Sequence, residues 1–156
     1  MHPVFADAIE SLHPSFERLV SMPPLANGQF PRVMPASGIY LFSESGRHLY
    51  VGRSRNMRRR YGLHTRHSAQ HNQASFAFLL SREAMGFPKA SYRAGELSRS
   101  GLLQNSEFFD EFTKAKARIR LMEYRYVEEP DPTRQALLEI YCAVALGTRY
   151  NDFDTH

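Results

Sequence analysis

The sequence predicts an α+β fold, and three observations carry this prediction. Residues 39–42 and 48–51 read as short strands on either side of a turn, while helical patterns precede and follow them. The chain has 156 residues, of which 42% are hydrophobic, so it can bury a substantial core. No composition shift or internal repeat marks a second domain. We therefore expect a single domain that spans residues 1–156.

The N-terminal part predicts a helix that packs on its own domain. Phe5, Ile9, Leu12 and Phe16 recur at helical spacing. The stretch 22–35 contains several prolines and is expected to be an irregular lead into the first strand. We expect residues 1–35 to form a helical extension of the domain.

The two strands are expected to form a hairpin around Glu44-Ser45-Gly46, which fits a three-residue loop closed by glycine. This loop would place Tyr40 opposite Tyr50 and Phe42 opposite His48 on one face. Leu41 would lie opposite Leu49, and Ile39 opposite Val51, on the other face. The two tyrosines either form part of a polar site or are only an aromatic pair that stabilises the hairpin.

A strongly basic stretch follows the hairpin. Residues 55–64 read as a helix on which Arg60 and His64 are four residues apart and therefore share a face. Between Ser45 and Arg82 the sequence contains no Asp or Glu. Such a patch is either a solvated face or a binding surface for a polyanion, and we favour the polyanion. The candidate phosphate-binding side chains are Arg53, Arg55, Arg58, Arg59 and Arg66.

A helical insertion is expected between this helix and a third strand at 118–127. Residues 74–85 read as a helix that ends at Phe87-Pro88, and residues 101–116 offer a second helical stretch. The insertion, at about 72–117, either clamps a ligand or thickens the core.

The last predicted helix is well delimited by Asp131 as N-cap, Pro132 at its first position and Gly147 at its end. Its interior is apolar nearly all round, and Glu139 is the single charge inside it. A buried carboxylate needs a partner, which is either an arginine from the basic helix or a divalent cation. Alternatively, Glu139 lies exposed at the lip of the helix.

Taken together, these residues resemble the GIY-YIG nuclease superfamily. The matching elements are Gly38-Ile39-Tyr40, Tyr50-Val51-Gly52 in place of the YIG triplet, then Arg60 with His64, Glu139, and Asn151. The resemblance covers about residues 37–151. It implies a small, three-stranded, largely antiparallel sheet flanked by helices, with the N-terminal helix and the helical insertion as additions. It also implies hydrolysis of phosphodiester bonds in DNA with one divalent metal, Mg²⁺ or Mn²⁺.

Residue roles also follow from the resemblance. Tyr40 would be the general base, with Tyr50 and His64 positioning or deprotonating its phenol. Arg60 would stabilise the scissile phosphate, Glu139 would bind the metal, and Asn151 would support the site through hydrogen bonds. A phenol is a weak base at neutral pH, so positive charge from Arg60 and the metal is expected to favour the phenolate.

The composition of the chain indicates its partner and its compartment. The net charge of +4 agrees with a DNA partner, and the single cysteine, Cys142, agrees with a reducing cytoplasm. No apolar run or signal pattern indicates a membrane or export. A homodimer is possible because one active site cuts one strand. Two alternatives are a zinc site at His64, His67 and His71, and a non-catalytic DNA-binding module that retains the fold.

Overall fold

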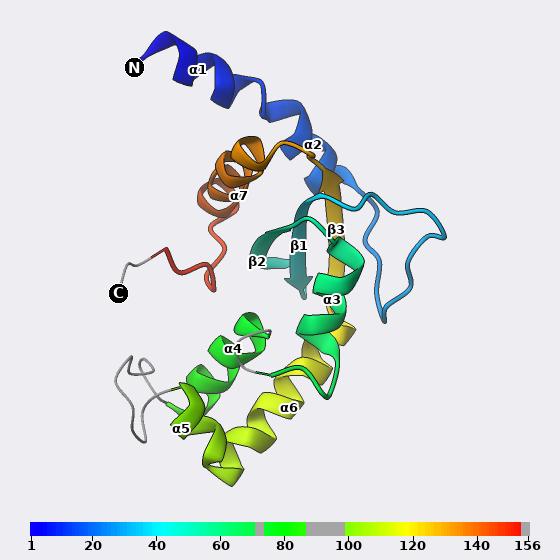
Figure 1. Cartoon of the computed structure of the whole chain (residues 1–156), viewed down its shortest axis with the longest axis vertical. Coiled ribbons are helices and arrows are strands. Elements are labelled where there is room, and N and C mark those ends of the chain that lie inside the picture. Colours follow the sequence, from blue (N-terminus) through cyan, green and yellow to red (C-terminus); the bar gives the residue numbers. More distant parts are fainter. Residues whose placement is uncertain (71–73, 87–98, 154–156) are drawn as a thin grey trace. The chain divides into compact units, whose positions relative to one another are not determined.

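The structure, a computed structural model, describes residues 1–70, 74–86 and 99–153. These residues group into two compact units (Figure 1). The first comprises Met1–Arg60 and Met122–Asp152, and the second comprises Tyr61–Leu121 with Phe153. The expectation of a single domain stays a prediction, and each unit is described by itself below.

The first unit is built on an antiparallel sheet of β1 (Gly38–Glu44), β2 (Arg47–Ser54) and β3 (Glu123–Glu128), in the order β2-β1-β3. This confirms the predicted α+β class with a three-stranded sheet between helices. The central strand β1 is buried along nearly its whole length. Gly38 lies so close to β3 that a Cβ there would overlap the carbonyl oxygen of Val127. A glycine at this position therefore lets the two strands pair.

The hairpin differs from its prediction in loop and register. The loop consists of Ser45 and Gly46, which both have positive φ, as a two-residue type I′ turn requires. A bulge lies between Phe42 and Ser43, and Leu49 is the extra residue on β2. Consequently Tyr40 pairs with Gly52 instead of Tyr50.

The remaining pairs shift in the same way. Phe42 pairs with Tyr50 and Leu41 pairs with Val51, so the predicted pairs with His48 and Leu49 were wrong. Because the register moves by two residues here, each of these side chains keeps the face that the sequence predicted.

One face of the sheet carries the apolar core of the first unit. Ile39, Leu41 and Val51 pack there with Leu138 and Cys142 of α7 (Pro132–Leu146). Both predicted ends of α7 are confirmed: the Asp131 side chain accepts a hydrogen bond from the backbone N–H of Arg134 at 2.8 Å, and Gly147 adopts a left-handed conformation.

The N-terminal helix lies on this core as expected, but in two pieces, α1 (Pro3–Glu10) and α2 (His13–Ser21). The break precedes Pro14, which lies in the first turn of α2, where its missing N–H costs nothing. Leu12 and Leu19 are buried in the core, with Ile9 and Phe16 packed against it. In Figure 1, α2 and α7 both flank the sheet.

The segment that leads into β1 contacts the outer edge of β3. Leu25 and Tyr124 exchange two backbone hydrogen bonds, of 2.9 and 2.7 Å. The Phe30 ring meets the Tyr124 ring edge-on at 5.7 Å. The segment therefore pairs with the edge of β3 at Tyr124 and brings Phe30 against the Tyr124 ring, on the face of the sheet opposite to the apolar core.

The second unit is helical. After α3 (Met57–Thr65), which crosses the boundary between the units, it contains α4 (Ser75–Met85), α5 (Arg99–Gln104) and α6 (Ser106–Leu121). Phe78 of α4 packs on Phe108 of α6 with ring centroids 5.3 Å apart. Residues 118–121, predicted as strand, continue α6 because Ile119 is buried on its apolar face. The predicted stop at Phe87-Pro88 lies outside the described residues. Within the described part of the chain, no helix is both long and apolar enough to cross a bilayer.

Candidate active site

Tyr40 lies at the centre of the sheet, and only 2% of its surface is exposed. Its ring crosses the backbone of Gly52 on β2, so that a Cβ at Gly52 would overlap Cζ and Oη of the phenol. The register places these two residues opposite each other. Glycine at position 52 therefore leaves the space in which the Tyr40 phenol lies.

Aromatic rings surround Tyr40 on this face. The ring of Tyr124 on β3 stacks on it at 5.9 Å, and the ring of Tyr50 on β2 lies 6.4 Å away. Tyr50 was predicted from the sequence as a site residue, whereas Tyr124 was not. Strand alternation would place Tyr124 and Tyr126 on the same face as each other, but the predicted strand began five residues too early to draw attention to this pair.

Burial raises the pKa of Tyr40 well above its ordinary value, and the negative charges of Tyr50, Tyr124 and Glu139 raise it further. The Arg60 guanidinium lowers the pKa of Tyr40, in the direction expected from the sequence, but burial outweighs it. Without another cation, Tyr40 is therefore a neutral phenol at neutral pH.

Glu139 on α7 is half-buried, with 19% of its side chain exposed, and it pairs with an arginine. Its Oε2 lies 3.0 Å from Nε of Arg53. The partner belongs to the end of β2; the sequence had left an arginine of the basic helix, a divalent cation and an exposed carboxylate as alternatives. Burial raises the pKa of Glu139, while the charges of Arg53 and Arg60 and the hydrogen bond from Arg53 lower it. Burial thus favours the protonated form of Glu139, while the two guanidinium groups favour its carboxylate form.

Arg60 differs from its helical neighbours in burial and contacts. It is half-buried, while Arg58 and Arg59 are exposed. Arg58 donates to the carbonyl oxygen of Pro31 at 2.9 Å and lies over the Phe30 ring. Arg60 acts on the pKa of both Tyr40 and Glu139. The first unit therefore brings together the predicted residues Tyr40, Tyr50, Arg60 and Glu139.

Asn151 binds the strand that carries Tyr50. Its Oδ1 accepts a hydrogen bond from the Val51 N–H at 2.9 Å, and its Nδ2 donates to the Val51 carbonyl at 2.7 Å. The backbone N–H of Tyr150 also donates to the carbonyl of Leu49 at 3.1 Å. The Asn151 amide thus satisfies both backbone groups of Val51 at the outer edge of β2, as a residue on a neighbouring strand would.

The other predicted site residues are distributed over both units. His64 is buried on α3 and belongs to the second unit. Arg55 and Arg66 are exposed, and the Arg66 guanidinium lies over Gly62 one turn earlier on α3. Of the three histidines considered for zinc, His71 lies outside the described residues.

No three His, Cys, Asp or Glu side chains gather in a way that could hold a metal ion among the described residues. Glu139 is the half-buried carboxylate beside the two tyrosines. A single carboxylate does not match the closed ligand set of structural zinc. It does match Mg²⁺ or Mn²⁺, which bind one or two carboxylates and complete their shell with water and substrate phosphate.

Comparison of the chain with known protein-family models, curated proteins and solved structures yields no match.

Proposed function

We propose that the protein is a metal-dependent endonuclease of the GIY-YIG type that hydrolyses phosphodiester bonds in DNA. The observation that carries the proposal is that Tyr40 lies across Gly52, the residue before Arg53, whose guanidinium pairs with Glu139 at 3.0 Å. Arg60 also lies close enough to affect the pKa of both Tyr40 and Glu139. Two phenols, a guanidinium and a carboxylate next to a basic stretch suit the cleavage of a phosphodiester.

In this proposal each side chain has its own role in the reaction. Arg60 binds the scissile phosphate, for which a planar guanidinium offers two parallel donors. Tyr40 first loses its phenol proton to His64 or to solvent, and the phenolate then takes a proton from the attacking water, with Tyr50 positioning the phenolate. Asn151 holds the Val51 backbone and thereby the position of Tyr50.

Glu139 would hold the metal ion, Mg²⁺ or Mn²⁺. When bound, the ion would offset the carboxylate charge that raises the Tyr40 pKa and would stabilise negative charge on the phosphate. Arg53 must then release the carboxylate. A DNA phosphate is the natural second partner for its guanidinium, because 48% of the Arg53 side chain is exposed.

The proposal also includes a binding partner, a number of copies and a location in the cell. DNA is the partner, and the exposed Arg55, Arg59 and Arg66 contribute to its binding. Two copies act together on duplex DNA, since one site cuts one strand. We place the protein in the cytoplasm, where the buried thiol of Cys142 stays reduced.

A second candidate is a DNA-binding module that does not cut. The Arg53–Glu139 ion pair favours it, because the pair already compensates the carboxylate without a metal. The raised pKa of Tyr40 also favours it, since a neutral phenol is a poor base.

The two candidates are distinguished by cleavage assays. Purified protein is incubated with supercoiled plasmid, branched DNA and single-stranded DNA, in Mg²⁺, Mn²⁺ or EDTA. Glu139→Gln is expected to abolish cleavage and keep DNA binding, while the matched control Glu128→Gln, at an exposed carboxylate, cuts normally. Binding without cutting in every metal would establish the non-catalytic module.

The phenol and the guanidinium have matched controls as well. Tyr40→Phe is expected to slow cleavage about 100-fold or more, the range for loss of a general base. Tyr141→Phe, which removes a hydroxyl that contacts His13, should leave cleavage unchanged. Arg60→Gln should lower turnover, whereas Arg59→Gln should lower salt-sensitive affinity only. Equal turnover in Tyr40→Phe and the parent protein would remove Tyr40 from the role of base.

A further inference from the structure

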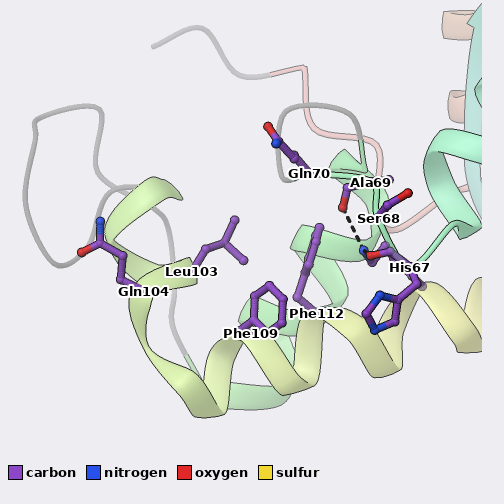
Figure 2. Close-up of a pocket in the computed structure, with 9 residues that line it drawn as sticks. His67, Ser68, Ala69, Gln70, Leu103, Gln104, Phe109 and Phe112 are labelled. Carbon is purple, nitrogen blue, oxygen red and sulfur yellow. Dashed lines mark hydrogen bonds between the residues drawn. The ribbon is translucent and has the colours of Figure 1, made fainter.

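The helical second unit contains a pocket of about 450 Å³ that the proposed nuclease chemistry does not use. Figure 2 shows its walls: Phe109 and Phe112 project from α6, Gln104 comes from α5, and the segment with Ser68 and Gln70 lies on the other side. This volume falls in the range of pockets that enclose small organic ligands.

The charge of the pocket favours an anionic over a cationic ligand. Among the described residues that line it there is no carboxylate, and the lining includes Lys116. Lys116 is only 2% exposed, and its Nζ donates to the carbonyl oxygens of His67 and Ala69. Its ammonium also lies 4.6 Å from the centre of the Phe112 ring. Burial lowers the pKa of Lys116, and two of its N–H groups already bond carbonyl oxygens. Within the described residues no carboxylate pairs with Lys116, so its positive charge favours an anionic group in the pocket.

The remaining lining chemistry fits a planar aromatic ligand. Phe109 and Phe112 are three residues apart on α6 and so lie on one face. Phe109 is 46% exposed, which leaves one aromatic ring open to stacking.

We propose that this pocket binds an unstacked nucleobase of a DNA strand, with Phe109 as the stacking platform and Lys116 attracting the attached phosphate. The inference rests on the proposed DNA partner and deepens it, since it assigns unpaired or single-stranded DNA as the preferred substrate. Stacking on aromatic side chains is how proteins hold single strands without sequence preference.

The chain contains no tryptophan, so Phe109→Trp introduces a single fluorophore at the pocket. The matched control is Phe5→Trp on α1, where the native ring is 48% exposed. Both full-length variants are titrated in EDTA, which prevents cutting. The probes are an oligodeoxyadenylate, a duplex with one unpaired adenine, the same duplex fully paired, and dAMP. The anisotropy of labelled DNA reports total binding in parallel.

The expected result is quenching of Trp fluorescence in Phe109→Trp, but not in Phe5→Trp, by the single strand and the bulged duplex. The fully paired duplex should require about tenfold more DNA.

Unchanged fluorescence in Phe109→Trp while anisotropy reports bound DNA would overturn the inference, as would equal quenching in both variants. Quenching by dAMP alone would assign the pocket to free nucleotides and overturn the strand-binding form. Failure to bind any DNA would overturn both the inference and the proposed partner. Loss of metal-dependent cleavage with quenching intact would overturn the nuclease and leave the pocket assignment standing.

Discussion

Substitution of Gly52 by alanine tests the packing at the centre of the candidate site. The φ of Gly52 is one that other residues adopt, so the backbone by itself tolerates alanine. In a strand interior the exchange would then stabilise the protein by about 0.5–1 kcal/mol. The added Cβ, however, would overlap Cζ and Oη of Tyr40. The phenol cannot move aside easily, because its ring is buried against those of Phe42 and Tyr124.

The expected change in stability is the cost of the clash with Tyr40 minus the gain in backbone entropy. Forcing a methyl group into a packed core costs about 1–3 kcal/mol. After the gain in backbone entropy is subtracted, Gly52→Ala should destabilise the protein by about 1 kcal/mol and by no more than about 2.5 kcal/mol. For a chain of this size each kcal/mol lowers Tm by about 2–4 °C. Since the clash displaces the Tyr40 hydroxyl, any cleavage activity should fall more steeply than stability.

Urea unfolding of four proteins measures this: the parent, Gly52→Ala, Tyr40→Leu and the double variant. If the cost arises from the phenol, the alanine should become neutral or stabilising once the phenol has been removed by Tyr40→Leu. Gly62→Ala is the matched control. A Cβ there would meet only the flexible end of the Arg66 side chain, so alanine on α3 should stabilise by up to about 1 kcal/mol.

Two results would refute the reasoning. One is a Gly52→Ala protein that is as stable as the parent, which would mean that Tyr40 does not lie across Gly52. The other is an equal cost of the alanine in the parent and in the Tyr40→Leu background, which would locate the strain elsewhere.

Three further predictions concern the first unit. Asn151→Leu should cost about 1–3 kcal/mol in urea unfolding, because the Val51 N–H and C=O lose both partners; an unchanged midpoint would show that water replaces the amide. Asp131→Ala should cost about 1 kcal/mol through loss of the N-cap to Arg134, whereas Asp131→Asn should cost little. Burial raises the pKa of Cys142 from 9.0 to about 12, so the unfolded chain loses this proton first and stability should fall as pH rises from 9 towards 12. Cys142→Ala should reduce this slope, and an unchanged slope would assign it to other groups.

Much of the fold and several candidate residues could be predicted because they depend on local patterns. The caps of α7 follow from Asp131, Pro132 and Gly147, whose preferences act within one helical turn. Strand alternation assigned Tyr40 to one face and Leu41 to the other, and a register shift of two residues preserves this assignment.

Other predictions failed where local preference was not decisive. The predicted hairpin loop was one residue too long, because Ser45 is not a residue that usually adopts positive φ. The third strand was predicted from residue 118, yet burial of Ile119 in the second unit keeps α6 helical to Leu121.

The sequence by itself determined which chemical groups are present and on which face of each strand they lie, because side-chain direction follows from backbone periodicity. Only the tertiary structure decided which groups meet. The pairing of Glu139 with Arg53, the stacking of Tyr124 on Tyr40 and the contact of Tyr40 with Gly52 all join residues from different elements. The pKa of Tyr40 was likewise decided there, since burial depends on the packing of the whole sheet and not on the charges of its sequence neighbours.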